Sequence, residues 1–338
     1  MVPALAVAEA LRAEGVEVAF IGGDRAEAQL VPAAGFPLQR ISVQGLSRSN
    51  PLRALRALVL AALAVTRARG LLKELAPAAV LGGGGYVAGP VGLAALTLRI
   101  PLVLSEADSH LGLPNRLLAR FARRVCLAFP IAGREGSRYR VTGRPVAPPQ
   151  RDRVAARASM GVPPQATCVL VFGGSLGARS INLAAVEAFA GAPFHVLHVS
   201  GRRDHDELVA RGLPADYDLR AYLPLADFLD ALAAADLVVA RSGGSVFEIA
   251  AHGLPAVLIP YPHAAGDHQS ANARWMAEAG AALVIADSEL SGPRLGGEVA
   301  ALLADPRRLA AMGAAAAGLA RPRAAQEIAE ELLDAVRS

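Results

Sequence analysis

Short runs of valine, leucine and isoleucine alternate with longer helical stretches along the whole chain. Runs of this kind, separated by helices, are typical of parallel sheets that are covered on both faces. Twelve runs fit a strand: 16–22, 38–43, 79–83, 102–106, 125–129, 139–143, 168–173, 195–200, 219–223, 237–241, 256–261 and 282–286. The pattern therefore predicts an α/β protein built on parallel sheets.

The proline-rich stretch GRPVAPPQRDR, residues 143–153, interrupts the alternation near the middle of the chain. Prolines exclude a central strand and favour an extended linker. A chain of 338 residues is long enough for two domains of ordinary size. We therefore expect two doubly wound domains, joined near residue 147 and facing a cleft, with ligands at the carboxyl ends of the strands.

The opening MVPALAVAEALRAEGVEVAFIGG predicts a helix and then a strand. Apolar residues recur at helical spacing up to Leu11, Gly15 breaks the pattern, and the strand run 16–22 follows. The strand candidates thus begin only after a helix, which is unusual for a parallel α/β domain.

Composition excludes one class of partner. The net charge is +4, which is low for a nucleic-acid-binding protein. Aromatic residues make up only 4% of the chain and do not interleave with the basic ones, as a stacking platform for single strands would require. We therefore expect no nucleic-acid partner.

The two cysteines, Cys126 and Cys168, each lie in an apolar strand-like run. Such cysteines are more often small buried hydrophobic residues than a disulfide. We therefore expect two reduced thiols, as in a cytoplasmic protein.

The segment 50–77, NPLRALRALVLAALAVTRARGLLKELAP, is apolar and basic at once. Its uninterrupted apolar run is too short to span a bilayer. Arginines 53, 56, 67 and 69 flank this run, so the segment suits an amphipathic helix on an anionic membrane surface. The alternative is a crossover helix whose apolar face packs on the sheet.

Three glycine-rich stretches follow strand candidates and precede helices: VLGGGGYVAGPVG at 80–92, VFGGSLGARSIN at 171–182 and VARSGGSVFEIAAHGLP at 239–255. Glycines at such turns let a backbone approach a ligand, and the N–H groups of the next helix favour an anion such as phosphate. None matches a P-loop or a dinucleotide fingerprint. A tight strand-to-helix turn without a ligand is the alternative for each stretch.

The third stretch contains Ser245 and Glu248 at the spacing of a capping box. Gly253 and then Pro255 end the predicted helix. Glu248 therefore has two interpretations: it caps the Ser245 N–H, or it accepts hydrogen bonds from sugar hydroxyls while the turn faces a diphosphate.

The next stretch, PYPHAAGDHQSANA at 260–273, is crowded with polar residues. It has no cysteine, and no second cluster completes a metal shell, so we expect neither a metal ion nor another cofactor. Gln269 and Asn272 with Asp267 suit a surface that binds hydroxyl groups. We found no signature of nucleophilic catalysis either.

The motifs GGGGYVAGP, GLPNRLLAR, GGSLGARSIN and RSGGSVFEIAAHGLPAVLIPYPHAAGDHQSANA, in this order, resemble the MurG family over nearly the whole chain. These are UDP-N-acetylglucosamine:undecaprenyl-diphosphate-muramoyl-pentapeptide N-acetylglucosaminyltransferases. The resemblance implies a GT-B fold of two Rossmann-like domains: residues 1–147 with a C-terminal helix at about 323–338, and residues 148–322. It also implies inverting transfer of GlcNAc from UDP-GlcNAc to the 4-hydroxyl of lipid I, at the cytoplasmic face of the membrane.

The resemblance assigns roles to residues of this chain by position. Ser175 would contact the diphosphate, Leu223 the uracil through its backbone, and Glu248 and Gln269 the sugar hydroxyls. The whole donor set comprises Asp108, Ser175, Asn182, Leu223, Arg241, Gly243, Gly244, Ser245, Val246, Phe247, Glu248, Gln269 and Asn272. The acceptor set comprises Gly84, Gly85, Tyr86 and Asn115. The catalytic candidates are Glu106 and Glu248.

The sequence also departs from the family pattern. In the family a strand and a glycine-rich turn ending in histidine precede the first helix, so we expect the strand 16–22 to lack its inner neighbour, and stability and transfer to be poor. Ser105 and Asp108 replace a histidine and an asparagine, and Ala147 replaces an arginine while Arg144 lies nearby. Partners implied are UDP-GlcNAc, lipid I, an anionic membrane through 50–77 and other proteins of cell-wall synthesis.

Two other functions fit parts of the same pattern. The chain could be a related GT-B enzyme, such as a UDP-GlcNAc 2-epimerase or a glycosyltransferase for soluble acceptors, although the apolar and basic segment 50–77 argues against it. It could also be a truncated, non-catalytic protein that binds nucleotide-sugar.

Overall fold

The computed structural model describes residues 1–41, 51–174 and 176–337, with the side chains of all of these except 51–61 and 265. The chain divides into two compact units. Unit 1 comprises Met1–Val146 and Arg321–Ser338, and unit 2 comprises Ala147–Ala320.

Each of the twelve predicted runs overlaps a strand, although β5 begins one residue and β9 two residues before the predicted run. In unit 1 the strands are β1 (Phe20–Gly22), β2 (Leu38–Arg40), β3 (Val80–Gly82), β4 (Leu102–Glu106), β5 (Arg124–Leu127) and β6 (Tyr139–Val141). In unit 2 they are β7 (Cys168–Phe172), β8 (His195–Val199), β9 (Tyr217–Arg220), β10 (Leu237–Ala240), β11 (Ala256–Leu258) and β12 (Ala282–Val284). All pairings are parallel, which confirms the predicted α/β class.

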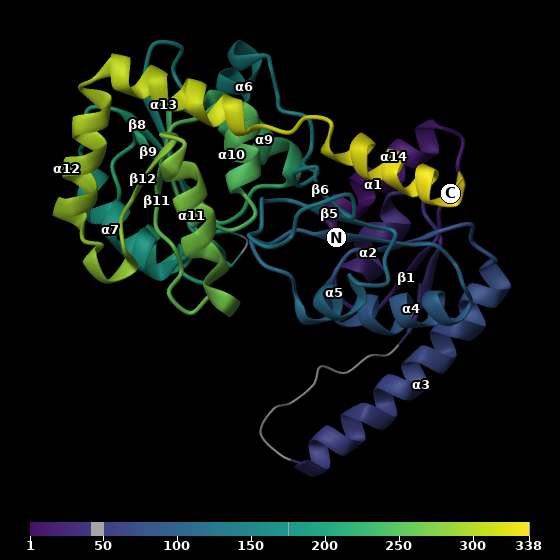
Figure 1. The fold of residues 1–338 in the computed structure, drawn as a ribbon. Helices are drawn as coiled ribbons and strands as arrows, with labels where there is room; N and C mark the ends of the chain where they lie inside the picture. Colours follow the sequence, from purple (N-terminus) through teal and green to yellow (C-terminus); the bar gives the residue numbers. More distant parts are fainter. Residues whose placement is uncertain (42–50, 175, 338) are drawn as a thin grey trace. The chain divides into compact units, whose positions relative to one another are not determined.

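Helices separate the strands in both units (Figure 1). Unit 1 contains α1 (Val2–Ala13), α2 (Glu27–Ala33), α3 (Pro51–Leu75), α4 (Gly85–Thr97), α5 (Leu113–Leu118) and α14 (Ala324–Arg337). Unit 2 contains α6 (Arg153–Met160), α7 (Arg179–Phe189), α8 (His205–Val209), α9 (Leu225–Ala234), α10 (Val246–His252), α11 (His268–Glu278), α12 (Gly292–Leu303) and α13 (Pro306–Leu319), with short 3₁₀ turns η1 (Ala265–Asp267) and η2 (Asp287–Glu289).

The sheet of unit 2 has the strand order β12-β11-β10-β7-β8-β9. Numbered in chain order within the unit, this is 6-5-4-1-2-3, the order of a doubly wound dinucleotide-binding fold. All five residues of β7 are buried, because α7 and α9 cover the two faces of this central strand. Both cysteines, Cys126 in β5 and Cys168 in β7, are buried free thiols, as the sequence predicts.

The strands of unit 1 form two separate parallel sheets. β3, β4, β5 and β6 form one, and β1 and β2 form the other. Among the described residues β1 pairs only with β2. The strand itself is shorter than predicted, because residues 16–19 take part in no ladder.

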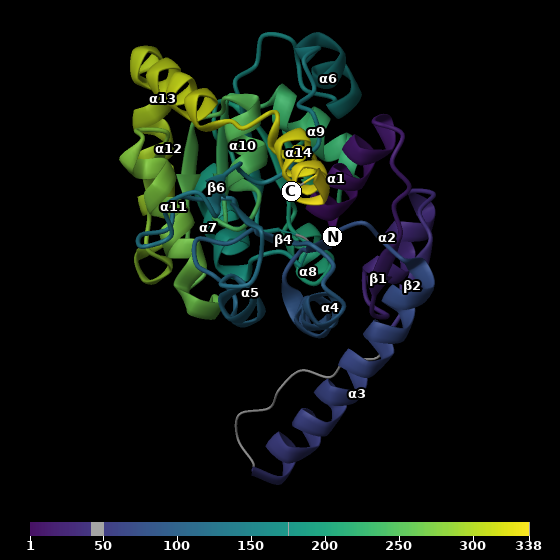
Figure 2. The ribbon, with the colours of Figure 1, turned by 45° about the vertical axis from the view of Figure 1, so that its right-hand side comes forward.

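The two ends of the chain meet in unit 1, where α1 and α14 pack side by side (Figures 1 and 2). Val7 and Leu11 of α1 and Ile328 of α14 share a core cluster with Val103 of β4. Glu331 of α14 lies nearly buried and forms ion pairs with arginines of β5 and β6, at 2.8 Å from Arg124 and 3.3 Å from Arg140. The C-terminal helix is thus part of the core of unit 1.

The apolar and basic segment forms the helix α3, which packs on α4 through its C-terminal half. Ala68, Leu71 and Leu72 are buried there, as a crossover helix requires. Residue 50 and the side chains of Arg53 and Arg56 lie outside the described part. In the part of the chain that the structure describes, no helix has both the length and the hydropathy needed to cross a bilayer.

Candidate functional site

The winding of unit 2 reverses between β7 and β10, which are neighbours in the sheet. From β7 the chain moves to β8 and β9 on one side, and from β10 to β11 and β12 on the other. At such a switch point the loops beyond the carboxyl ends separate, and open α/β folds bind ligands there. Residues 173–178 and 241–245 follow these two strands, so two predicted glycine-rich turns flank the switch point.

The turn after β7 depends on its glycines. At Gly173 an added Cβ would lie 2.4 Å from the backbone nitrogen of Ala178. Gly177 has a φ of +76° and packs against the backbone after β8, where an added Cβ would lie 2.0 Å from the carbonyl oxygen of Ser200. Ser175, which the sequence places on a diphosphate, lies outside the described residues. The turn leads directly into α7 at Arg179.

Arg241, at the end of β10, is nearly buried and has several partners. Its guanidinium donates to the carbonyl oxygens of Ile259 and Pro260, each at 3.1 Å. It also donates to Ser180 Oγ of α7 at 2.8 Å and pairs with the Asp287 carboxylate at 2.6 Å. This arginine therefore ties the start of α7 to the loops after β11 and β12, on the two sides of the switch point.

The turn after β10 presents backbone rather than side chains. Val246 and Phe247 are buried, so only their backbone groups are left for a ligand in the turn 243–247, while Glu248 is half-buried. One half of the predicted capping box is wrong: Ser245 has helical angles, φ −62° and ψ −11°, and its side chain makes no capping bond. In this conformation the hydroxyl does not reach the N–H groups one turn ahead. The predicted helix end is confirmed, since Gly253 is left-handed at φ +65°.

The polar stretch 260–273, which contains Gln269 and Asn272, contacts the start of this turn at Ser242. Ser242 Oγ donates to the backbone carbonyl of Gln269 at 2.7 Å, and Gln269 Oε1 accepts from the N–H of Tyr261 at 3.0 Å. Asn272 is buried and donates to the carbonyl oxygen of Ser242 at 3.0 Å. Among the described residues no group hydrogen-bonds to the buried Oδ1 of Asn272.

Two further predicted donor residues of unit 2 are buried as well. Asn182 is fully buried in the first turns of α7, beneath the turn after β7. Leu223 is nearly buried and lies in the loop after β9, because that strand ends at Arg220 rather than at 223. Asp108 belongs to unit 1, whereas the other described donor residues belong to unit 2.

In unit 1 the predicted acceptor residues gather at the carboxyl ends of β3 and β4. Gly84 and Gly85 both have positive φ, +78° and +76°, which only glycine adopts at low cost. Tyr86 is exposed, and its ring lies 5.8 Å from the guanidinium of Arg25. An added Cβ on Gly84 would lie 3.8 Å from the Asn115 amide, so the glycine turn and α5 adjoin.

Glu106, a catalytic candidate, is nearly buried and accepts three hydrogen bonds. Its Oε1 accepts from the Asp108 N–H at 3.2 Å, and its Oε2 accepts from the Gly112 N–H at 2.8 Å and from Asn115 Nδ2 at 3.0 Å. Asn115 Nδ2 also donates to the Ser105 carbonyl at 3.1 Å. The carboxylate thus closes the loop 107–112 on itself, which is the geometry of a residue that shapes a loop.

Sequence reasoning missed several buried polar residues around α7. His198 of β8 lies between Tyr217 of β9 and Asn182, and Ser180 lies between Arg241 and Asp287. The only sequence signal for His198 is an imidazole inside an apolar strand, and a satisfied core histidine gives the same signal. Nothing in the sequence places Asp287 near α7.

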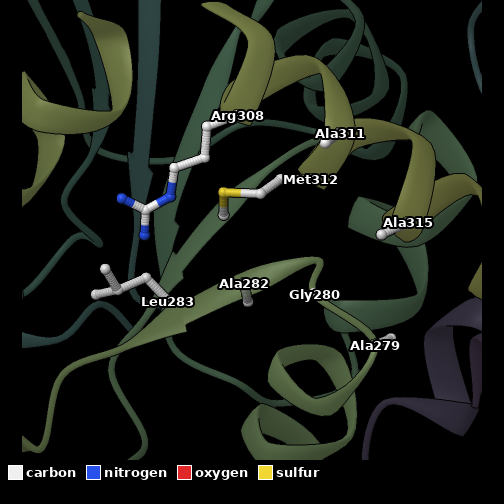
Figure 3. A pocket seen from close by; sticks show the side chains of 8 residues that line it. All are labelled: Ala279, Gly280, Ala282, Leu283, Arg308, Ala311, Met312 and Ala315. Atoms are coloured by element: carbon white, nitrogen blue, oxygen red, sulfur yellow. The ribbon is translucent and has the colours of Figure 1, made fainter. Parts of the chain in front are cut away.

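A cavity of about 570 Å³ lies elsewhere in unit 2 (Figure 3). Arg308 and Met312 of α13 face Leu283 and Ala282 across it. It adjoins the start of β12, whereas the glycine-rich turns follow the ends of their strands. Among the described residues no group of three histidine, cysteine or acidic side chains could hold a metal ion.

Comparisons with known proteins agree with this arrangement. The glycosyltransferase family 28 N-terminal domain matches residues 1–127, and the glycosyltransferase family 28 C-terminal domain matches residues 168–328. The second match contains both glycine-rich turns of the switch point.

Full-length relatives carry one activity in their names. The chain is 42% identical to the UDP-N-acetylglucosamine–N-acetylmuramyl-(pentapeptide) pyrophosphoryl-undecaprenol N-acetylglucosamine transferase of Moorella thermoacetica, over 99% of this chain and 96% of that protein. It is 44% identical to the protein of the same name from Rubrobacter xylanophilus, over 98% of this chain and 99% of that protein.

Solved structures extend the likeness to the fold. The crystal structure of Acinetobacter baumannii MurG matches with a TM-score of 0.81 and 31% identity, over 98% of this chain and 95% of that one. UDP-GlcNAc 2-epimerase from Neisseria meningitidis matches with a TM-score of 0.68 but only 12% identity, over 98% of this chain and 96% of that one, and therefore shares the fold alone. The chain has the α/β GT-B fold and belongs to glycosyltransferase family 28, within the MurG family of N-acetylglucosaminyltransferases.

Proposed function

We propose that this protein transfers GlcNAc from UDP-GlcNAc to the muramoyl 4-hydroxyl of lipid I, with inversion at the anomeric carbon, to form lipid II. One observation carries the proposal: two glycine-rich turns flank the switch point of a parallel sheet, inside the region that matches the family 28 C-terminal domain. The names of relatives at 42% and 44% identity supply the substrates.

The donor belongs in unit 2 on this proposal. The turn 173–178 meets the diphosphate through backbone N–H groups, which suit an anion at the start of α7. The turn 243–247 offers further backbone groups on the other side of the switch point, and Glu248 and Gln269 bind hydroxyls of the sugar. Asn182 and Arg241, both nearly or fully buried, support these turns from behind.

The acceptor belongs in unit 1. The positive-φ turn Gly84–Gly85 approaches the lipid diphosphate, with Tyr86 exposed beside it. Glu106 and Asn115 hold the adjoining loop through the bonds described above. Reaction is a direct displacement: the 4-hydroxyl oxygen bonds to the anomeric carbon and its proton passes to a base, while the bond to UDP breaks and backbone N–H groups stabilise the charge on the leaving diphosphate.

We also place unit 1 on the cytoplasmic face of an anionic membrane. Two helices that both pack on α4 carry exposed apolar and basic side chains: Leu63 and Arg67 on α3, and Leu117, Arg120 and Phe121 at the end of α5. Apolar insertion combined with basic contacts is how an interfacial surface binds anionic lipid. Such a surface would bring the site to an acceptor whose lipid is anchored in the membrane, alongside other cell-wall synthesis proteins.

Acceptor-dependent release of UDP tests the transfer directly. Purified protein, UDP-GlcNAc and a lipid I analogue should release UDP and yield a disaccharide product, and omission of the analogue should abolish release. Conversion of UDP-GlcNAc to its 2-epimer without acceptor would instead favour the epimerase alternative. Binding of UDP without any turnover would favour a non-catalytic binding protein.

Co-sedimentation with vesicles tests the membrane surface. Vesicles that contain phosphatidylglycerol should bind the wild type, and the double variant Arg67→Glu, Phe121→Ser should bind at least several-fold more weakly. Arg307→Glu, a change at an exposed arginine of unit 2, is the matched control and should bind as the wild type does. Equal binding of all three proteins would refute this surface.

A further inference from the structure

A chain of buried polar side chains runs beneath the turn 173–178. Tyr217 OH lies 2.8 Å from His198 Nδ1, and His198 Nε2 lies 3.0 Å from Asn182 Oδ1. Asn182 Nδ2 lies 2.9 Å from the carbonyl oxygen of Ser200 and 2.9 Å from Asp204 Oδ2. Asn182, His198 and Ser200 have no exposed surface at all, so none of them contacts a ligand directly.

The direction of each hydrogen bond in this chain is fixed. Asn182 Nδ2 faces two acceptors, so its Oδ1 must accept from His198 Nε2–H. His198 Nδ1 then carries a lone pair and accepts from the Tyr217 hydroxyl. Burial lowers the pKa of His198 to about 3, so the imidazole is neutral and holds this single tautomer.

Asp204, at the end of this hydrogen-bonded series, carries a charge. Hydrogen bonding to Arg203 is the main cause that keeps the pKa of the Asp204 carboxyl below its usual value. Asn182 and Arg179 add to the effect, and Arg179 lies 3.7 Å from Asp204. An ionised Asp204 holds the second N–H of Asn182, so the amide cannot rotate without breaking a charge-assisted bond.

The hydrogen-bonded series also holds the backbone at Ser200, which contacts the glycine-rich turn. Asn182 donates to the carbonyl oxygen of Ser200. This is the oxygen that would lie 2.0 Å from a Cβ added at Gly177. Gly201, at φ +80°, approaches equally closely, since its added Cβ would lie 2.5 Å from the nitrogen of Gly177. The two backbones touch without side chains between them, so a shift of Ser200 must shift the turn.

We propose that Asn182, His198 and Tyr217 are positioning residues for the donor's diphosphate: they fix Ser200–Gly201 and thereby the backbone of Gly177, on which the N–H groups of residues 176–178 depend. The inference rests on the proposed function of unit 2 and assigns a role to His198 and Tyr217 within it. Asn182 acts through the turn rather than on the sugar-nucleotide.

The test compares binding of UDP with binding of UMP by calorimetry. His198→Leu leaves Asn182 Oδ1 and the Tyr217 hydroxyl without partners, and should weaken UDP about tenfold while it changes UMP much less. His198→Gln keeps an N–H at the position of Nε2 and should recover most of the loss. His195→Leu, a histidine of the same strand outside the chain of bonds, should bind UDP as the wild type does.

Steady-state kinetics give an independent readout. His198→Leu should raise KM for UDP-GlcNAc about tenfold and leave KM for the lipid I analogue within twofold of the wild type, whereas general loss of folded protein would lower kcat alone. Tyr217→Phe removes one hydroxyl only, and keeps the test decisive where His198→Leu does not fold. We expect it to raise KM for UDP-GlcNAc about threefold.

Donor binding by unit 2 and the positioning role of His198 and Tyr217 are contradicted by different results. Wild-type protein that binds no UDP contradicts the proposed function itself. Wild-type protein that binds UDP, with folded His198→Leu or Tyr217→Phe showing unchanged preference for UDP over UMP, overturns only the positioning role. Equal losses in His195→Leu and His198→Leu overturn it as well.

Discussion

Replacement of Glu106 by glutamine separates two roles for this buried carboxylate. The structure shows it as the acceptor of three hydrogen bonds from its own loop and from α5. A loop-shaping residue acts on acceptor binding, whereas a catalytic base acts on the chemical step. Because glutamine has nearly the same shape, Glu106→Gln changes hydrogen bonding and charge but not packing.

The magnitude follows from the three bonds. The glutamine amide oxygen can keep the two donors now at Oε2, Gly112 N–H and Asn115 Nδ2, but as neutral bonds. Its NH₂ group then faces the Asp108 N–H, so that bond is lost. Charge-assisted bonds contribute about 1.5–3 kcal/mol and neutral ones about 0.5–1.5, so the two bonds that become neutral lose about 2–3 kcal/mol together and the lost third bond adds about 1.5–3. If the whole loss of about 3.5–6 kcal/mol appeared in acceptor binding, affinity would fall at least about 100-fold.

Steady-state assays with a lipid I analogue measure the effect. Glu106→Gln should raise KM for the analogue by at least tenfold, while the Kd for UDP should stay within twofold of the wild type. Glu135→Gln, the same change at an exposed position of unit 1, is the matched control and should alter neither value.

Two results would refute this reasoning. An unchanged acceptor KM with kcat reduced more than a hundredfold would show that the carboxylate takes part in the chemistry. No effect on either constant would show that the three hydrogen bonds do not control the loop's function.

Three further outcomes concern stability and reactivity. Lowering the pH from 7 to 5 should destabilise unit 2 by about 2 kcal/mol through His198. The folded pKa of His198, about 3, lies below the unfolded value of about 6.5, so the stability that the neutral imidazole contributes is lost as the pH falls below about 6.5. In thermal melts, the melting temperature of His198→Gln should fall less over this pH range than that of the wild type. Glu331→Ala should lower the melting temperature of unit 1, at a cost of about 1–3 kcal/mol, since it leaves Arg124 unpaired. Burial raises the pKa of both thiols, Cys126 and Cys168, to about 12, so maleimide should label neither before the protein unfolds.

The alternation of apolar runs was enough to predict the twelve strands, because a strand buried on both faces needs a continuous apolar run. Strand ends were harder to predict. The run 16–22 is apolar except for Glu17, yet only Phe20–Gly22 joins a ladder, because a strand also needs a hydrogen-bonded neighbour. Similarly, β9 begins at Tyr217 and ends at Arg220, although neither residue fits an apolar pattern.

The glycine-rich turns were predictable for a related reason. A backbone that must approach another backbone within the reach of a Cβ tolerates only glycine, and this restriction is visible in sequence. The side-chain hydrogen bonds near the turns give no comparable signal in the sequence. The Ser245–Glu248 spacing predicts a capping box, but the local conformation of Ser245 decides whether its hydroxyl can cap, and that conformation depends on the packing of Val246 and Phe247.

The same contrast explains why a residue matched by position can have a role that its motif does not suggest. Asn182 lies four residues beyond the turn 173–178, and its side chain finds its partners on β8 and in the loop that follows β8. Those partners follow from the strand order β7-β8-β9, which no local pattern encodes. A polar residue just inside a glycine-rich turn can therefore support the turn instead of binding the ligand, and burial distinguishes the two: a fully buried amide can act on the diphosphate only through the backbone that it holds.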